Sequence, residues 1–220
     1  MLDEKTINLK GKKRIGLMGG TFDPIHQGHL VTAEAARAEF SLEKVVFVPS
    51  GEPPHKKGFL ISNKEARYLM TVLATSANPF FEVSRLELDR PGKSYAIETV
   101  QYFHRQMDEG SELFFITGAD AILEIVTWKN VKNLFAWCTF IAATRPGYDL
   151  GALREKLLEK LSPSSLAKII PLEVPAMAIS STDIRQRVGR GCTVKYLLPA
   201  EVESFINKNG LYQESIISEV

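Results

Sequence analysis

Short, continuous apolar runs alternate along the chain with longer segments in which apolar residues recur at helical spacing. The apolar runs, most of which end at Gly or Pro, predict buried strands at residues 13–18, 45–48, 80–84, 112–117, 138–144 and 168–171. The amphipathic segments predict helices at residues 30–40, 64–77, 95–107, 149–161, 182–188 and 200–209. Strands that alternate with helices predict an α/β fold with a doubly wound, parallel, Rossmann-like sheet.

Polar residues and glycine mark where several of these helices begin or end. Ser62 and Asn63 can cap the helix that starts at residue 64, and Ser94 can cap the helix after it. Gly210 marks the end of the last helix. The Pro- and Gly-rich loop at residues 50–58 follows a predicted parallel strand, a position at which loops tend to carry function.

The composition is that of an ordinary globular protein. Of 220 residues 45% are hydrophobic and 24% are charged, and the net charge of +1 argues against a nucleic-acid partner. No apolar run approaches the ~18 residues of a membrane span. The two cysteines cannot form a disulfide framework or a Cys-based zinc site. The chain starts without the apolar core of a signal peptide, so a cytoplasmic protein is expected.

The run GGTFDPIHQGH, which begins at Gly19, joins the first predicted strand to the first predicted helix. Its glycines are not spaced as in a dinucleotide-binding GxGxxG, and it lacks the Lys-Ser/Thr ending of a P-loop. Gly19 and Gly20 nevertheless allow a ligand to approach the backbone, and the helix N-terminus near Gly28 offers N–H groups to phosphate. His26 and His29 share one helical face and can bind phosphate oxygens as charge develops on a leaving group.

Two other interpretations of the histidines in this run do not involve phosphate. The histidines could act only as turn and cap residues, or belong to a metal site, for which the spacing fixes no third ligand. However, half of the chain's 4 histidines fall in this one span at a strand-to-helix junction. That concentration favours phosphate binding.

A second phrase, ISSTDIR, begins at Ile179 and opens a later helix. The hydroxyls of Ser180, Ser181 and Thr182 can cap that helix and donate to phosphate. Arg185 lies three residues past Thr182, so it can fold back over the helix start and hold phosphate through two N–H groups. Alone, the phrase is more typical of an ordinary cap with a surface Arg. Together with the first run it indicates a second phosphate-binding helix start.

The two phrases resemble the HxGH and ISSTxxR signatures of the nucleotidylyltransferase superfamily, and the chain is similar to its bacterial nicotinate-nucleotide adenylyltransferases. Further matches follow in the family's order: PPHK at residues 53–56, SYAIET at 94–99, GAD at 118–120, WK at 128–129, TRPG at 144–147, YLLP at 196–199 and NGLY at 209–212. The resemblance spans residues 13–213. It implies one domain over that range, with an N-terminal extension at residues 1–12 and a C-terminal tail at residues 214–220.

The resemblance implies a role for each matching residue. The catalytic residues, which would contact the ATP phosphates, are His26, His29, Arg185 and Lys56. The other residues implied to bind ATP are Gly19, Gly20, Thr21, Phe22, Gly28, Gly118, Asp120, Ile179, Ser180 and Ser181. Those implied to bind nicotinate mononucleotide are Tyr95, Ala96, Arg145 and Trp128, the last by stacking on the pyridine ring.

Two positions on the pyridine side depart from the family. Ala96 stands where the family often has Thr, and Lys129 where it often has an aromatic residue. Backbone N–H groups near Ala96 and Trp128 are the expected donors to the nicotinate carboxylate, and they do not depend on the missing Thr hydroxyl.

The implied reaction transfers the adenylyl group of ATP to nicotinate mononucleotide, giving deamido-NAD and pyrophosphate, a step of NAD biosynthesis. The attacking phosphate has a second pKa near ~6 and is largely ionised at neutral pH, so no general base is required. Catalysis then consists of in-line alignment and charge neutralisation. The sequence offers no carboxylate cage for a metal, so Mg²⁺ is expected to be carried mainly by the ATP phosphates and by water.

Other interpretations are open at this point. A pantetheine-phosphate adenylyltransferase shares the second phrase but usually has Thr at the position of His26. A nucleotide-binding sensor would keep the fold without turnover, and an NAD-dependent dehydrogenase would need the missing GxGxxG. Some residues have structural alternatives: Trp128 as core, Asp120 as a helix N-cap, Asp23 as a turn former, and Lys56 and Arg145 as loop charges. The oligomeric state is open, with a homo-oligomer as one option.

Overall fold

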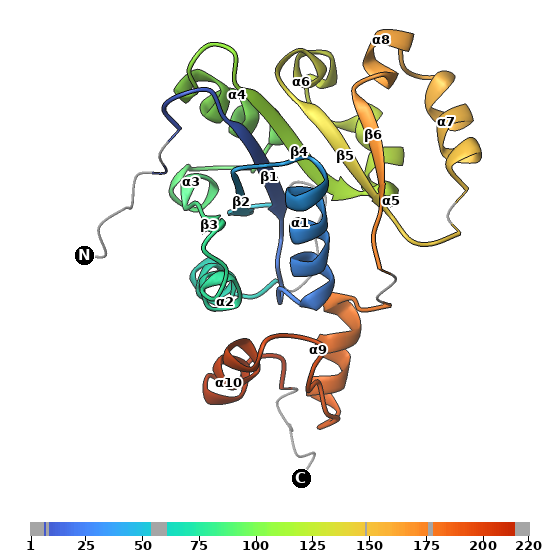
Figure 1. Ribbon diagram of the computed structural model, residues 1–220. Coiled ribbons are helices and arrows are strands. Elements are labelled where there is room, and N and C mark those ends of the chain that lie inside the picture. Colours follow the sequence, from blue (N-terminus) through green and yellow to red (C-terminus); the bar gives the residue numbers. More distant parts are fainter. Residues whose placement is uncertain (1–6, 8, 54–60, 148, 176–177, 214–220) are drawn as a thin grey trace.

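A parallel sheet forms the centre of the protein. The computed structural model describes residues 7, 9–53, 61–147, 149–175 and 178–213 (Figure 1). The sheet that these residues form has 6 strands in the order β3-β2-β1-β4-β5-β6, and every neighbouring pair is parallel. The strands are β1 (Arg14–Gly20), β2 (Lys44–Pro49), β3 (Phe81–Val83), β4 (Glu112–Gly118), β5 (Thr139–Thr144) and β6 (Ile169–Glu173). This order confirms the predicted doubly wound, Rossmann-like α/β fold.

Helices cover both faces of the sheet (Figure 1). Those that share one core cluster with the strands are α1 (Gln27–Glu39), α2 (Lys64–Thr75), α9 (Ser181–Gly189) and α10 (Ala200–Lys208). Those that share the other cluster are α4 (Ala96–Gln106), α5 (Ala119–Leu123), the 3₁₀ turn η1 (Ile125–Thr127), α6 (Val131–Trp137) and α7 (Leu150–Leu158). The remaining described elements are the short helices α3 (Leu86–Asp89) and α8 (Pro163–Leu166).

Side chains along each strand alternate between the two clusters. Ile15 and Leu17 of β1 pack with α4, α5 and α6, whereas Met18 packs with α1 and α2. Phe114 and Phe115 of β4 likewise belong to opposite clusters. Parallel strands that are covered on both faces have continuous apolar runs, which explains why the sequence pattern located them.

The predicted strands and helices are confirmed, with ends shifted by a few residues. Asn63 caps α2 as predicted, because its side chain accepts the backbone N–H of Glu65. The prediction for Ser94 is wrong: Tyr95 is the N-cap of α4, and Ser94 Oγ instead accepts the N–H of Gly51 over 3.0 Å. The sequence pattern does not predict α3, α6 or α8, since elements of 7 residues or fewer carry little periodicity.

Both ends of the described chain pack onto this core. Leu9, within the predicted N-terminal extension, is buried in the cluster beneath α4. At the other end α10 packs on α2, and the chain then turns at Gly210. Figure 1 shows α9 and α10 together at one end of the sheet, below α1 and α2 in the view. The domain limits at residues 13 and 213 stay a prediction.

Candidate functional site

The chain winds in opposite directions from β1 and β4, the two central strands of the sheet. β1 ends at Gly20 and β4 ends at Gly118, so the loops that follow them diverge at one edge. In doubly wound folds ligands bind at this switch point, outside the carboxyl ends of the strands. Here it contains the first predicted phosphate motif and a cavity with aromatic walls.

The first motif forms a tight loop between β1 and α1, called here the phosphate turn (residues 21–26). His26 is the N-cap of α1, and its backbone N–H donates to Nδ1 of His29 over 3.2 Å. The two imidazole rings stack with their centroids 3.8 Å apart. A Cβ on Gly28 would lie only 3.1 Å from the His26 ring, so a glycine at this position leaves room for the ring. Both histidines therefore lie at a helix N-terminus, where backbone N–H groups attract anions.

Both imidazoles are neutral at pH 7 in the free protein. Burial lowers the pKa of His26 from 6.5 to about 4, and burial together with the His26 charge lowers the pKa of His29 to about 3. Because Nδ1 of His29 accepts a hydrogen bond, the proton of that neutral ring lies on Nε2, which is then a donor. Nδ1 of His26 is buried and has no hydrogen-bond partner among the described residues. This atom lies against the first turn of α1, 3.1 Å from the position that a Cβ on Gly28 would take.

Helix α9 brings the second motif onto the phosphate turn. Ser180 caps α9, and its side chain accepts a backbone N–H of the first turn over 3.1 Å. Ser181 Oγ donates to the carbonyl of Pro24 over 2.8 Å, across 157 residues of sequence. Nη1 of Arg185 donates to the carbonyl of Asp23 over 2.7 Å. These bonds join the N-terminus of α9 to that of α1, so two anion-attracting helix ends meet at one place.

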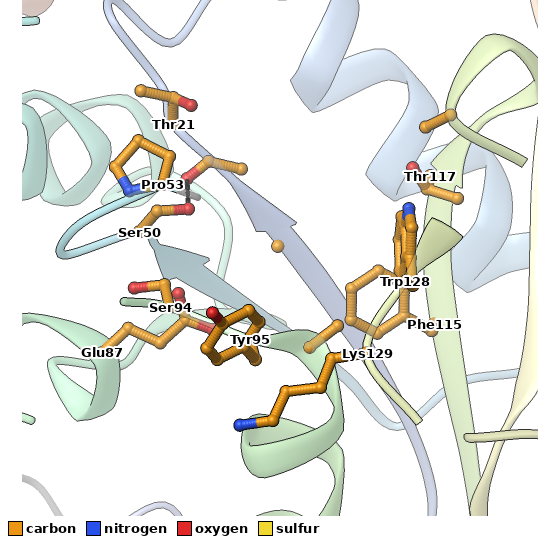
Figure 2. Close-up of a pocket in the computed structure, with 14 residues that line it drawn as sticks. Thr21, Ser50, Pro53, Glu87, Ser94, Tyr95, Phe115, Thr117, Trp128 and Lys129 are labelled. Atoms are coloured by element: carbon orange, nitrogen blue, oxygen red, sulfur yellow. Dashed lines mark hydrogen bonds between the residues drawn. The ribbon is translucent and has the colours of Figure 1, made fainter. Parts of the chain in front are cut away.

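A cavity of about 290 Å³ opens beside the phosphate turn (Figure 2). The indole of Trp128 stands edge-on to the rings of Phe115 and Phe140, with centroids 5.7 Å and 6.2 Å away, so packing sets its orientation. Figure 2 shows Tyr95 across the cavity from Trp128. Aromatic side chains on opposite walls favour a flat ring system. The cavity is lined by Gly19, Gly20, Thr21, Ser50, Pro53, Glu87, Ser94, Tyr95, Ala96, Phe115, Thr117, Ala121, Trp128 and Lys129.

The charged side chains that line this cavity are Glu87 and Lys129. Glu87 is buried, and this burial raises the pKa of its carboxyl, which accepts a hydrogen bond from Thr99 Oγ1. The ammonium of Lys129 lies 2.9 Å from Oε1 of Glu98 and 4.2 Å from the centre of the Tyr95 ring. Figure 2 shows the Lys129 side chain reaching past Tyr95. Lys129 thus links the segment after η1 to the first turn of α4, across one side of the cavity.

Six of the predicted site residues line the cavity, namely Gly19, Gly20, Thr21, Tyr95, Ala96 and Trp128. Phe22 does not, because it is 2% exposed and its ring packs edge-on against His29 at 5.1 Å. The Phe22 side chain therefore packs against His29 and does not line the cavity. The backbone N–H of Trp128 already donates to the carbonyl of Ile125 over 3.0 Å, so the first turn of α4 is the better source of donors for a carboxylate.

Other predicted residues lie outside the cavity. Gly118 is the N-cap of α5, so the alternative in which Asp120 is the N-cap is wrong; Asp120 is exposed in the first turn. Arg145 is exposed just after β5, and Ile179 is partly exposed before α9. Lys56 lies outside the described residues.

Arg67 is a residue of the site that the sequence motifs do not reveal. It is 1% exposed and donates to the carbonyls of Thr21 (2.7 Å), Gly51 (3.1 Å) and Ser62 (3.1 Å). It thereby ties the phosphate turn to the segments that follow β2 and precede α2. Its signal in the sequence is helical spacing, which places it on the same buried face of α2 as Met70.

Several lining residues of the cavity are also missed by sequence motifs. Ser50 directly follows β2, and Phe115 and Thr117 lie within β4, so in the sequence they resemble ordinary residues of a strand and its end. Their position is the usable signal, because they flank the point at which a doubly wound sheet binds its ligand.

The donors gathered at the phosphate turn are imidazole, guanidinium, hydroxyl and backbone N–H groups. They suit phosphate oxygens, whereas Mg²⁺ prefers oxygen ligands. In the described ranges no group of three or more His, Cys, Asp or Glu side chains could hold a metal ion. Within the same part of the chain, no helix has both the length and the apolar character needed to cross a membrane.

The fold and the site define an α/β nucleotide-binding protein, with two phosphate-attracting helix ends at the switch point of its sheet. The sequence profile of the cytidylyltransferase-like family matches residues 17–187. The chain belongs to this family and, within it, to the nicotinate-nucleotide adenylyltransferases.

Two bacterial relatives carry the description "probable nicotinate-nucleotide adenylyltransferase". The one from Moorella thermoacetica is 58% identical over 200 residues, which cover 91% of this chain and 92% of the relative. The one from Thermoanaerobacter is 54% identical over 203 residues, which cover 91% and 95%. Among solved structures, Plasmodium falciparum nicotinic acid mononucleotide adenylyltransferase complexed with NaAD shares the fold, with a TM-score of 0.70 and 17% identity over 91% of this chain and 97% of that one.

Proposed function

We propose that the protein transfers the adenylyl group of ATP to nicotinate mononucleotide, giving deamido-NAD and pyrophosphate, a step of NAD biosynthesis. One observation carries the proposal: the start of α9 is bonded to the phosphate turn, beside a cavity with aromatic walls. A reaction that joins two nucleotides needs such a phosphate site next to a ring site. The names of the bacterial relatives support the same activity. Because the reaction consumes ATP, a cytoplasmic location is proposed with it.

The site divides into a part for each substrate. His26, His29, Ser181 and Arg185 would hold the ATP phosphates, and the adenosine would extend along the residues after β4 and before α9. Nicotinate mononucleotide would place its pyridine ring in the cavity between Trp128 and Tyr95, with its carboxylate near the N-terminus of α4. The backbone at the end of β1 lies between the two parts and can contact both.

The proposed chemistry is an in-line displacement at the α-phosphorus of ATP. A phosphate oxygen of nicotinate mononucleotide forms the new bond, while the bond from that phosphorus to the bridging oxygen of the β-phosphate breaks and its electron pair leaves with pyrophosphate. The nucleophile is largely ionised at neutral pH, since its second pKa is about 6. No protein base is therefore needed.

The residues of the site then align the two phosphates and neutralise the charge that grows on the leaving pyrophosphate. Nε2 of His29 is a donor, and the planar guanidinium of Arg185 can hold two oxygens. Lys56 is proposed to add a further cation. When bound, Mg²⁺ would neutralise further negative charge on the phosphates. Because the residues of this site are hydrogen-bond donors and not metal ligands, the ion would be held by the ATP phosphates and by water.

Pyrophosphate release tests the proposal. The full chain is given MgATP with nicotinate mononucleotide, nicotinamide mononucleotide or 4′-phosphopantetheine in separate reactions, and chromatography identifies the dinucleotide formed. We expect efficient release with nicotinate mononucleotide and the appearance of deamido-NAD. A His29→Ala preparation, made in parallel, controls for contaminating activity. Release with 4′-phosphopantetheine alone, or with no acceptor, would contradict the proposal.

A further inference from the structure

The NGLY motif at residues 209–212 reaches the phosphate turn from the far end of the chain. The Tyr212 hydroxyl donates to Oδ1 of Asp23 over 2.7 Å, across 189 residues of sequence. Oδ2 of Asp23 accepts the backbone N–H of Ser62 over 3.2 Å. Asp23 is only 3% exposed, so its buried carboxylate depends on such donors.

The end of α10 directs Tyr212 to this place. The N–H groups of Gly210 and Leu211 return to the carbonyls of Asn207 (3.3 Å) and Ile206 (3.0 Å), which is the Schellman arrangement of a helix end. Tyr212 then adopts a φ of 62°, a left-handed conformation that is uncommon for a bulky residue and persists where contacts hold it. Burial and the Asp23 charge raise the pKa of the Tyr212 phenol, so its hydroxyl stays a donor.

Asp23 also contacts Arg185. Its backbone carbonyl accepts Nη1 of Arg185 over 2.7 Å, while Nη2 donates to Oγ1 of Thr182 over 3.3 Å. Two N–H groups held by protein partners fix the plane of the guanidinium. The planar guanidinium can bind two phosphate oxygens at once only when its plane is aligned with them. A shift of Asp23 would therefore rotate the Arg185 guanidinium out of this alignment.

We propose that Tyr212 is a positioning residue that holds the Asp23 carboxylate and thereby sets the Asp23 carbonyl, which orients Arg185 toward the phosphates of ATP. The identity of that anion rests on the proposed function. Tyr212, Asp23 and Arg185 are not among the residues that line the aromatic cavity. Loss of the Tyr212 hydroxyl therefore acts on ATP binding and turnover, and leaves the binding of nicotinate mononucleotide unchanged.

Tyr212→Phe removes only this hydroxyl. We expect the Kd for ATP to rise about fivefold and kcat to fall about tenfold, because small misplacements of a charged clamp are costly in the transition state, while the KM for nicotinate mononucleotide stays within about twofold. Tyr102→Phe is the matched control, since Tyr102 is exposed on α4, and it changes none of these values. Thermal unfolding of both variants is followed, and the kinetics are measured well below the transition.

A second experiment makes Tyr212→Phe in an Arg185→Lys background. If Tyr212 acts through Arg185, adding Tyr212→Phe to the Arg185→Lys protein weakens ATP binding by less than about twofold. The reason is that the two substitutions disturb the same contact with ATP, so their effects do not add. An undiminished loss overturns the proposal. So does a Tyr212→Phe protein with wild-type ATP affinity and kcat, even if its melting temperature falls.

Calorimetry with ATP alone separates this proposal from the proposed function. A wild-type chain that binds ATP but releases no pyrophosphate with nicotinate mononucleotide would contradict the activity. The ATP affinities of wild type, Tyr212→Phe and the double variant would still decide the role of Tyr212.

Discussion

His26 donates its backbone N–H to Nδ1 of His29 over 3.2 Å, and the two imidazole rings stack with their centroids 3.8 Å apart. The hydrogen bond orients the His29 ring and leaves Nε2 as its donor atom. Stacking also means that a proton on one ring raises the cost of a proton on the other. The protonation states of the two rings are therefore linked.

Replacing His29 by Ala removes a donor from the place where charge grows on the leaving pyrophosphate. We expect kcat to fall by about 10²–10³. The affinity for nicotinate mononucleotide, measured by calorimetry, should stay close to wild type because His29 does not line the aromatic cavity. His104→Ala, at an exposed position of α4, serves as the control. An unchanged kcat in the His29 variant would remove this residue from the catalytic group.

Arg185→Lys keeps the positive charge but replaces a planar fork by a point charge. We expect kcat/KM for ATP to fall by about 10- to 100-fold, since an ammonium cannot hold two phosphate oxygens in a fixed plane. Arg187→Lys is the matched control on the same helix, because Arg187 pairs with Asp183 at 2.8 Å. Equal ATP kinetics for the two variants would show that Arg185 is only a surface cation.

Binding of ATP should be accompanied by proton uptake near neutral pH. Burial holds the pKa of His26 at about 4 and that of His29 at about 3 in the free protein. A bound polyphosphate favours the imidazolium and raises these pKa values, so we expect uptake of up to about one proton per site. Calorimetry of MgATP binding in buffers of different ionisation enthalpy measures this number. In His29→Gln the uptake should shrink; an equal uptake there would assign the proton to another group.

The same pKa values predict how stability depends on pH. A buried neutral histidine binds fewer protons when folded than when unfolded, where its pKa is about 6.5, so the free energy of unfolding falls as pH drops below about 6.5. The loss is at most about 1.4 kcal/mol per histidine and pH unit, and it continues until the folded pKa is reached. Urea unfolding at about pH 7 and about pH 5 measures it. His29→Gln should show a smaller difference between the two conditions than wild type.

Nicotinate mononucleotide should be preferred over its nicotinamide counterpart. The cavity opens on the N-terminus of α4 at Ala96, where backbone N–H groups suit a carboxylate but would face the NH₂ of an amide. Hydrogen bonds to a charged partner are worth roughly 1.5–3 kcal/mol, and a mispaired donor adds to the difference. We expect a ratio of at least about 10² in kcat/KM, measured for both acceptors on one preparation. Equal values would show that the enzyme is dual-specific.

Local patterns carry the parts of this protein that its sequence predicts. Apolar runs locate the strands because a parallel strand buried on both faces must be apolar throughout. Two histidines three residues apart share a face of any helix, and glycine at position 28 leaves room for the His26 ring. These relationships involve neighbours in the chain, so they can be read before the chain is folded. The sequence alone thus determined the α/β fold, the phosphate turn and the family that the chain resembles.

Only the tertiary structure decided which distant residues meet at that turn. Tyr212 reaches Asp23 across 189 residues, and Arg185 reaches the same residue across 162. Arg67 could be expected to be buried from its place on α2, yet its three carbonyl partners could not be expected. The physical reason is that a buried donor bonds to whatever backbone group the sheet and helices leave unpaired beside it. Which carbonyls those are depends on how the loops pack, and no local pattern of residues encodes it.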